Sequence, residues 1–432
     1  MDRLTRIDHW IDNYAQTYPF SGIVRISLKD KPIFEKCVGF ADREKEVPIT
    51  SRTKFRLYSL TKPFTALAVM TLVDRGLVSL EAHPSEYVPG ADVNEKVTVR
   101  SLLNHNSGLP DFAMLSDIQW AIDSYPVPKK EILRRFSVEH PLFPAGTDAW
   151  YGNFNFFLAS LIVENVSGMS FDAYIRREIF EKIGMENACF DSRFASNHGK
   201  AKGYDIEGMQ IVPCEYRSVD WMMGAGCGVA TASDVYQLNR AIKQRKLISE
   251  KAWQEVLTPA HGNFGLGMNI MKWHGKLRYT HNGGHMGFRT LHVQLPEDDF
   301  DIILLSNYGF GNARNAFSEA IYSIWYDDDA AADKGADMDR GFVRDTDIQG
   351  NVLNVTKPER VGGAGEYAGI YRNGSAVCEL KPSGQDYLLS FGGRTFPVYY
   401  AGKGLFRHKV IDESYVFSEK GGTKVFSGYV KI

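Results

Sequence analysis

Two residues that could perform covalent chemistry together are Ser59 and Lys62, in the stretch YSLTK. A serine hydroxyl becomes an effective nucleophile when a neighbouring base accepts its proton. A lysine one helical turn further on would lie near the serine Oγ, and burial in a partly dry pocket favours its neutral amine. The alternative is a serine that caps a helix, followed by a surface lysine. This stretch alone does not decide between the two interpretations.

A second Ser-x-x-Lys pattern, formed by Ser51 and Lys54, lies eight residues earlier in a polar segment that predicts a loop. Ser59 instead stands where a strand-like segment meets the apolar run of residues 64–73. That run predicts a buried helix that ends at Gly76. At the start of such a helix the serine Oγ is close to free backbone N–H groups and to the positive end of the helix dipole. Ser59 is therefore the candidate nucleophile.

A Tyr-x-Asn pattern, Tyr151 and Asn153, precedes another apolar segment that predicts a helix up to Gly168. A tyrosine on the loop before that helix can relay a proton if a nearby ammonium lowers its pKa. Asn153 could orient Lys62 and hydrogen-bond a substrate amide. The same pattern recurs at Tyr371, in a segment that we interpret as a strand running into a turn.

The third candidate stretch is YTHNGGHMGF, which contains His281, Asn282, Gly283 and Gly284 in order. The pattern predicts a strand that ends in a glycine-rich turn. A backbone N–H in that turn, unhindered by a side chain, could point at a developing oxyanion. Which histidine occupies the motif is open at this point, because the HMG that follows fits the same His-x-Gly pattern. A single histidine at a strand end is also more often structural than catalytic.

The elements that must position these groups follow from the spacing of apolar residues. An N-terminal helix is predicted over about residues 4–14. Polar turns between β-rich segments predict a hairpin around Lys29-Asp30-Lys31 and strands at residues 264–273, 276–282, 288–295 and 300–307, before a helix at about 312–326. The expected fold class is α/β (α+β), with an antiparallel sheet built from both chain ends, flanking helices, and a helical insertion at about residues 80–215.

The domain organisation follows from a change in composition after residue 326. Residues 1–326 form the predicted main domain, and the acidic, small and polar residues 327–357 predict a linker. Residues 358–432 contain short alternating strands with frequent glycine, which predict a small antiparallel all-β domain.

Composition narrows the function classes. The 432 residues carry a formal net charge of −2, which argues against general nucleic-acid binding. The five scattered cysteines form no Cys-x-x-Cys pattern and favour reduced thiols over disulfides or a zinc site. No segment reaches the ~18 consecutive apolar residues of a membrane span. The N-terminus lacks a signal-peptide layout, so we expect a cytoplasmic protein.

Taken together, these stretches resemble the serine β-lactamase-related, penicillin-recognising family. The chain is most similar to its class C β-lactamase branch, with its esterases and D-amino-acid-specific peptidases. The resemblance is carried by YSLTK, by YGN at Tyr151, and by HNG at His281, which stands where many members have Lys-Thr-Gly. It covers about residues 5–326, with the motifs in family-like order. The C-terminal β domain resembles accessory domains of some D-aminopeptidases.

The resemblance implies a β-lactamase/transpeptidase-like fold and a serine hydrolase that works through an acyl-enzyme. Ser59 would attack the acyl carbon, and Lys62 with Tyr151 would pass its proton to the leaving group. The backbone N–H groups of Ser59 and Gly284 would form the oxyanion hole. His281 would line the opposite wall. Asn153 would position Lys62 or the substrate amide, and no metal or organic cofactor would be needed.

The HNG stretch also bears on the expected substrate. A lysine is a permanent cation for a substrate carboxylate, whereas histidine is mostly neutral at pH 7. The amide of Asn282 could replace the missing threonine hydroxyl. A small-molecule or short-peptide ester or D-aminoacyl amide is therefore expected over resistance-grade β-lactam hydrolysis. The competing interpretations are a non-catalytic relative used for binding or assembly, and a penicillin-binding relative that is acylated without turnover.

Overall fold

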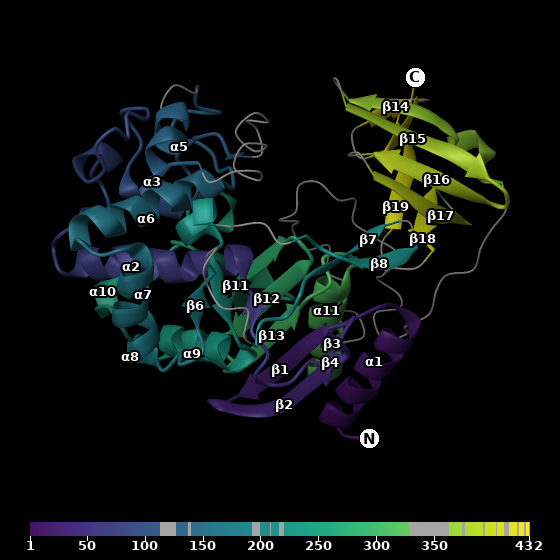
Figure 1. Ribbon diagram of the computed structural model, residues 1–432, viewed down its shortest axis with the longest axis horizontal. Helices are drawn as coiled ribbons and strands as arrows, with labels where there is room; N and C mark the ends of the chain where they lie inside the picture. The colour runs from purple at the N-terminus through teal and green to yellow at the C-terminus, as the bar shows by residue number, and fades with distance from the viewer. Residues whose placement is uncertain are drawn as a thin grey trace. The chain divides into compact units, whose positions relative to one another are not determined.

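The computed structural model describes residues 1–112, 127–136, 140–191, 199–207, 209–215, 220–327, 363–373, 376–391, 394–402, 404–409, 414–420, 423–426 and 429–431. The chain divides into two compact units (Figure 1). One contains Gly22–Gly203 and Cys214–Asn307, and the other contains Met1–Ser21, Tyr204–Pro213 and Tyr308–Ile432.

The unit that begins at Gly22 is built on a six-stranded antiparallel sheet, as the sequence predicts. Its strand order is β10-β11-β12-β13-β1-β2, so the first two strands of the chain pair beside four strands from the end of this unit. The strands are β1 (Gly22–Leu28), β2 (Lys31–Val38), β10 (Asn269–Trp273), β11 (Lys276–His285), β12 (Phe288–Leu295) and β13 (Phe300–Ser306). Every residue of the central strand β13 is buried.

Two-residue turns set the register of this sheet. Lys29 and Asp30 join β1 to β2, and Met286 and Gly287 join β11 to β12, all with positive φ. Such turns match the twist of the strands that they connect. The prediction of a glycine-rich turn at Gly283 and Gly284 was wrong, because both residues pair with β12 and the strand continues to His285.

The predicted buried helix is present as α2 (Lys62–Asp74), which follows directly from a 3-10 turn, η1 (Tyr58–Thr61). Lys62 and all ten residues after it are buried, which explains why the segment is apolar all round. Helix α2 contacts α6 (Asn153–Ser167), α7 (Phe171–Ile175) and α10 (Glu250–Leu257) (Figure 1).

Other elements of this unit are shorter. Its further helices are α3 (Val99–Leu103), α5 (Lys129–Phe136), α8 (Glu181–Ile183) and α9 (Ala232–Lys243), with 3-10 turns η2 (Pro84–Glu86), η5 (Asp220–Ala225) and η6 (His261–Asn263). Helix α9 contacts β1 and β13 of the large sheet. A three-stranded sheet contains β5 (Phe55–Arg56), β9 (Gly228–Ala230) and β6 (Cys189–Phe190), and β3 (Phe40–Asp42) pairs with β4 (Val47–Pro48).

The other unit contains the two terminal helices of the predicted main domain and a β barrel. Helices α1 (Arg3–Thr17) and α11 (Ala313–Tyr326) pack through aromatic rings, with Trp10 and Phe317 centred 5.2 Å apart. Strands β7 (Tyr204–Glu207) and β8 (Gln210–Pro213) form a hairpin inside the region predicted to be mostly helical.

The C-terminal strands close into an antiparallel barrel, which confirms the predicted all-β character of this part. A 3-10 turn, η8 (Ala364–Tyr367), precedes them. The barrel strands are β14 (Gly369–Asn373), β15 (Ala376–Ser383), β16 (Asp386–Phe391), β17 (Arg394–Gly402), β18 (Leu405–His408), β19 (Ser414–Lys420), β20 (Thr423–Phe426) and β21 (Tyr429–Lys431). The predicted linker, residues 327–357, lies outside the described residues except for Asp327. The domain boundaries themselves remain a prediction.

Among the described residues, no single helix has the length and apolar character needed to cross a membrane. The helices Asn153–Ser167 and Phe171–Ile183 pass that test of length and composition only as a pair, bent by 79°. Ten consecutive residues of α6, Phe154–Val163, are buried within the protein.

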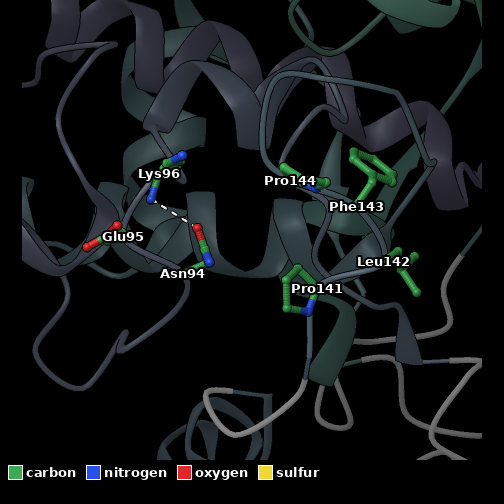
Figure 2. A pocket seen from close by; sticks show the side chains of 7 residues that line it. All are labelled: Asn94, Glu95, Lys96, Pro141, Leu142, Phe143 and Pro144. Atoms are coloured by element: carbon green, nitrogen blue, oxygen red, sulfur yellow. Dashed lines mark hydrogen bonds between the residues drawn. The ribbon is translucent and has the colours of Figure 1, made fainter.

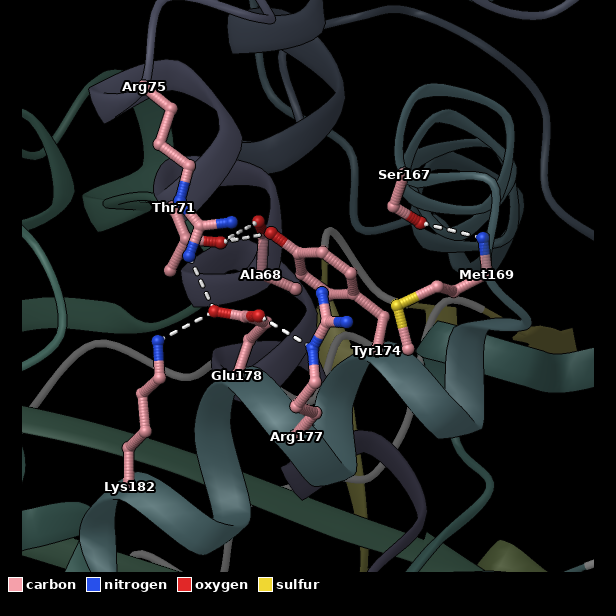
Figure 3. Close-up of polar contacts among 9 residues, drawn as sticks. All are labelled: Ala68, Thr71, Arg75, Ser167, Met169, Tyr174, Arg177, Glu178 and Lys182. Atoms are coloured by element: carbon pink, nitrogen blue, oxygen red, sulfur yellow. Dashed lines mark hydrogen bonds and ion pairs between the residues drawn. The ribbon is translucent and has the colours of Figure 1, made fainter.

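An ion cluster on Glu178 joins α2 to the π-helical turn η4 (Arg176–Phe180) (Figure 3). The Glu178 carboxylate accepts hydrogen bonds from Arg75 at 2.5 Å, Lys182 at 2.6 Å and Arg177 at 2.8 Å. Burial raises the pKa of Glu178, but these three hydrogen bonds outweigh burial and lower it to about 2. The cluster therefore stabilises the fold only while Glu178 is ionised.

We expect Glu178→Gln to lower the free energy of unfolding by about 1–2 kcal/mol at pH 7, a value reduced for the exposure of the three cations. The folded pKa lies below the ordinary value of 4.5, so this stabilisation is full above pH 4.5 and is lost as the pH falls toward 2. Urea unfolding of both proteins from pH 7 to pH 3 measures the difference. The exposed control Glu297→Gln should match the wild type, and a pH-independent cost of Glu178→Gln would contradict the assignment.

Candidate active site

Ser59 lies in η1, and it is the only residue from 55 to 72 that is not buried. Tyr58, immediately before it, has a φ of 47°, a left-handed conformation that is strained for a bulky residue. Neither Leu57, which precedes η1, nor Thr61, which precedes α2, caps the helix through its side chain. Ser59 is therefore not a helix cap, and it is half-buried between buried neighbours.

Lys62 is fully buried, and its ammonium group has three oxygen partners. Its Nζ lies 3.2 Å from Ser59 Oγ, 2.8 Å from Asn153 Oδ1 and 3.0 Å from the carbonyl oxygen of Ala225. Burial lowers the pKa of Lys62 to about 7, against a smaller opposing effect of the Asp111 charge. The alternative of a surface lysine at this position is wrong.

Asn153 is held in place by the carboxylate of Asp111. Its side-chain Nδ2 donates to Asp111 Oδ2 at 2.9 Å, and its backbone N–H donates to Asp111 Oδ1 at 2.6 Å. Phe154 N–H also donates to Asp111 Oδ1, at 3.2 Å. The carboxylate thus satisfies the first N–H groups of α6. It also fixes the Asn153 amide with its oxygen toward Lys62.

Tyr151 approaches Lys62 with its ring. Lys62 Nζ lies 4.6 Å from the centroid of that ring, within the range of a cation–π contact when the amine is charged. The ring of His281 is centred 6.3 Å from that of Tyr151, so the two predicted groups share one site. His281 is buried, and its Nδ1 lies 2.7 Å from the carbonyl oxygen of Asn282.

The end of β11 runs beside η1, where the resemblance implies an oxyanion hole. In a two-residue hairpin the flanking pair, His285 and Phe288, is hydrogen-bonded, and alternate residues then point away from the partner strand. Asn282 and Gly284 therefore direct their backbone N–H and C=O groups away from β12. Strand β10 pairs with β11 only from Lys276 to Thr280. Beyond Thr280, the side of β11 that faces away from β12 is therefore open to η1.

Gly283 has a different role from the one predicted for a turn. A Cβ atom at this position would lie 1.9 Å from the carbonyl oxygen of Leu57, just before η1. Thr290 Oγ1, on the neighbouring strand, donates to the same oxygen at 3.0 Å. The missing side chain of Gly283 allows the sheet to approach the turn that carries Ser59.

The structure thus brings Ser59, Lys62, Tyr151, Asn153 and the His281–Gly284 stretch together. Ser51 lies in an exposed turn, and Tyr371 is in β14 of the other unit. The sequence did not single out Asp111, Ala225 or His105, which contact the site through partners far from them in the chain. Among the described residues, no group of three or more His, Cys, Asp or Glu side chains is arranged to hold a metal ion.

A model of the beta-lactamase family matches residues 7–320. The chain belongs to the beta-lactamase family. It is similar to penicillin-binding protein 4* of Bacillus subtilis (strain 168), with 26% identity over 318 residues that span 68% of this chain and 70% of that protein. The family predicted from the sequence is therefore confirmed.

Solved structures confirm the predicted fold. The octameric penicillin-binding protein homologue from Pyrococcus abyssi covers 100% of this chain and 99% of its own, with a TM-score of 0.65 and 20% identity. The D-amino acid amidase of Ochrobactrum anthropi SV3, solved with D-phenylalanine, covers 76% of this chain and 99% of its own, with a TM-score of 0.64 and 22% identity. At these identities the likeness concerns the fold alone.

A cavity of about 480 Å³ lies apart from Ser59 and is lined by Asn94, Glu95, Lys96 and residues 141–144 (Figure 2). Its segment 141–144 contacts the loop that carries Asp111. Leu142 N–H donates to the carbonyl oxygen of Gly108 at 2.7 Å, in the loop that carries Asp111.

We expect Gly283→Ala to lower the free energy of unfolding by about 1–3 kcal/mol or more. The added Cβ would overlap the carbonyl oxygen of Leu57, which cannot move without a shift of the backbone. Gly284→Ala is the matched control, since a Cβ there would meet mainly the flexible side chain of Arg289, at 3.0 Å. Thermal unfolding measures both variants. Equal melting temperatures for the two would show that β11 does not pack tightly against η1.

Proposed function

We propose that this protein is a serine hydrolase in which Ser59 forms an acyl-enzyme with an ester or amide substrate and Lys62 is the base. The observation that carries the proposal is the set of atoms around Lys62 Nζ. Two of them, Asn153 Oδ1 and the Ala225 carbonyl oxygen, can only accept hydrogen bonds. The third, Ser59 Oγ, can either accept or donate.

This arrangement determines what happens when Lys62 loses a proton. A neutral amine has two N–H donors and one lone pair. The two donors serve Asn153 Oδ1 and the Ala225 carbonyl oxygen, so the lone pair points toward Ser59 Oγ. The serine hydroxyl then donates to the amine, which is the geometry for proton transfer as the oxygen attacks.

The remaining predicted groups have roles that their positions support. Tyr151, over Lys62, would help to pass the proton to the leaving group. The backbone N–H groups of Ser59 and Gly284 would stabilise the oxyanion. Asn282 and His281 would face the substrate from β11, and Asn153 would hold Lys62.

Esters and D-aminoacyl amides are the substrate classes that we favour. The similar amidase solved with D-phenylalanine supports an amide substrate, and His281 in place of a lysine supports a substrate without an obligatory carboxylate. A cytoplasmic location remains a prediction. The second candidate function is a penicillin-binding protein that is acylated without turnover, in line with the name of the Bacillus subtilis relative.

We expect a fluorophosphonate probe to add once to the wild-type protein, at Ser59. Ser59→Ala should abolish the adduct and all ester hydrolysis without altering the melting temperature, because a small, partly exposed side chain is removed. Peptide-mapped mass spectrometry measures the adduct. Ser51→Ala is the control, since it removes the serine of the other Ser-x-x-Lys pattern and should be labelled normally. Ester turnover by Ser59→Ala would refute the proposal.

The rate of Ser59 acylation should rise with pH through about 7 and level off above it. Lys62 must be neutral to accept the proton, and burial lowers its pKa to about 7. Stopped-flow acylation by a p-nitrophenyl ester from pH 5 to pH 9 measures the profile. Lys62→Met should slow acylation by about 10³-fold or more, whereas Lys54→Met should leave the rate unchanged. A flat profile, or rapid acylation of Lys62→Met, would remove Lys62 as the base.

A further inference from the structure

His105 is a buried histidine that contacts the chain on both sides of Tyr151. Its backbone carbonyl oxygen accepts a hydrogen bond from Trp150 N–H at 3.0 Å. Its side-chain Nδ1 accepts another from Gly152 N–H at 3.2 Å. One residue therefore binds the backbone immediately before and immediately after the tyrosine.

The imidazole ring also packs against the tyrosine itself. The ring centroids of His105 and Tyr151 lie 4.5 Å apart, with an interplanar angle of 36°. Phe156 and Phe264 enclose the imidazole on other sides, at 5.2 and 4.8 Å. With its ring enclosed in this way, His105 fixes both the backbone and the side-chain plane of Tyr151.

The hydrogen bonds define the protonation state of the imidazole. Because Nδ1 accepts from Gly152 N–H, the neutral ring carries its proton on Nε2. Asn155 presents its Nδ2 to the same Nδ1 at 3.5 Å, and Ser107 Oγ donates to Asn155 Oδ1 at 2.7 Å, which fixes that amide. Burial, and then the charges of Lys62 and His281, hold the pKa of His105 well below its ordinary value.

The backbone conformation of His105 allows it to make both contacts with residues 150–152. Its φ of 61° lies in the left-handed region, which Asn, Asp and His occupy more readily than other residues with a side chain. This conformation turns the carbonyl group and the ring toward the same short segment, residues 150–152.

We propose that His105 is a positioning residue that holds Tyr151 over Lys62 through the acceptor Nδ1, an inference that rests on the proposed function. Without that acceptor, Gly152 N–H loses its partner and the segment that carries Tyr151 can shift. A shift of about 1 Å at a group that moves a proton is enough to cost about 100-fold in rate. Because His105 is buried, a substrate in the site would not reach it, and substrate binding should change little.

The test compares His105→Asn with His105→Gln in the full chain. The Asn side chain places an oxygen near the position of Nδ1 and tolerates the left-handed backbone, whereas the Gln amide reaches toward the position of Nε2 and leaves Gly152 N–H unpaired. Both variants lack the ring, so the loss of packing is common to them. The readouts are kcat and KM for a p-nitrophenyl ester, together with the melting temperature.

We expect His105→Gln to lower kcat about 100-fold with KM changed less than about 3-fold, and His105→Asn to recover at least about 10-fold of that loss. Equal kcat in the two variants at equal melting temperature, or wild-type kcat in His105→Gln, would overturn the inference. The fluorophosphonate adduct on Ser59 of the wild type distinguishes a failure of the proposed function from a failure of the role of His105. If that adduct is absent the proposed function fails, and if it is present with equal kcat in both variants only the role of His105 fails.

Discussion

The burial of one amine, that of Lys62, is the constraint on which the rest of the site depends. An unpaired ammonium in the interior is costly, and the protein meets that cost with three oxygen partners and a lowered pKa. One partner is three residues away in the chain, and the other two are distant from Lys62 in the sequence. Helix α6 supplies Asn153, η5 supplies Ala225, and η1 supplies Ser59 itself. The core packing of α2 brings them together, because the lysine is the first residue of that buried helix.

Residues that contact the partners of Lys62 hold those partners in place. The Asp111 carboxylate both completes the N-terminus of α6 and fixes the amide of Asn153. Gly283 allows β11 to lie against the turn that carries Ser59, with Thr290 holding Leu57 from the neighbouring strand. The start of α6 and the register of β11 thereby help to set the distance between the Ser59 hydroxyl and the Lys62 amine.

The sequence predicted the parts of the site that are local. Ser59 and Lys62 are three residues apart at the start of an apolar segment, so their proximity follows from helix geometry alone. The long apolar runs of α2 and α6 and the polar hairpin turns were also readable, since their periods and turn residues are strong local signals. The order of the three motifs along the chain supported the family resemblance, which the family match confirms.

The parts that the sequence did not predict depend on tertiary contacts. Gly283 and Gly284 were expected in a turn because glycine favours turns, but pairing with β12 extends the strand through both residues. His105 and Asp111 have no local pattern that marks them, because their partners at residues 150–154 are about 40 positions away. In the barrel, Leu405–His408 is too short a strand to be recognised without its neighbours.

The most direct test of this account is the pKa of Lys62 in the free protein. The ¹⁵Nζ resonance of that residue, assigned by its loss in Lys62→Met, can be followed from pH 5 to pH 11. We expect a titration with a midpoint near 7, since burial disfavours the ammonium. A midpoint near the ordinary lysine value of 10.5 would mean that Lys62 stays charged at neutral pH, and it would contradict the assignment of this residue as the base for Ser59.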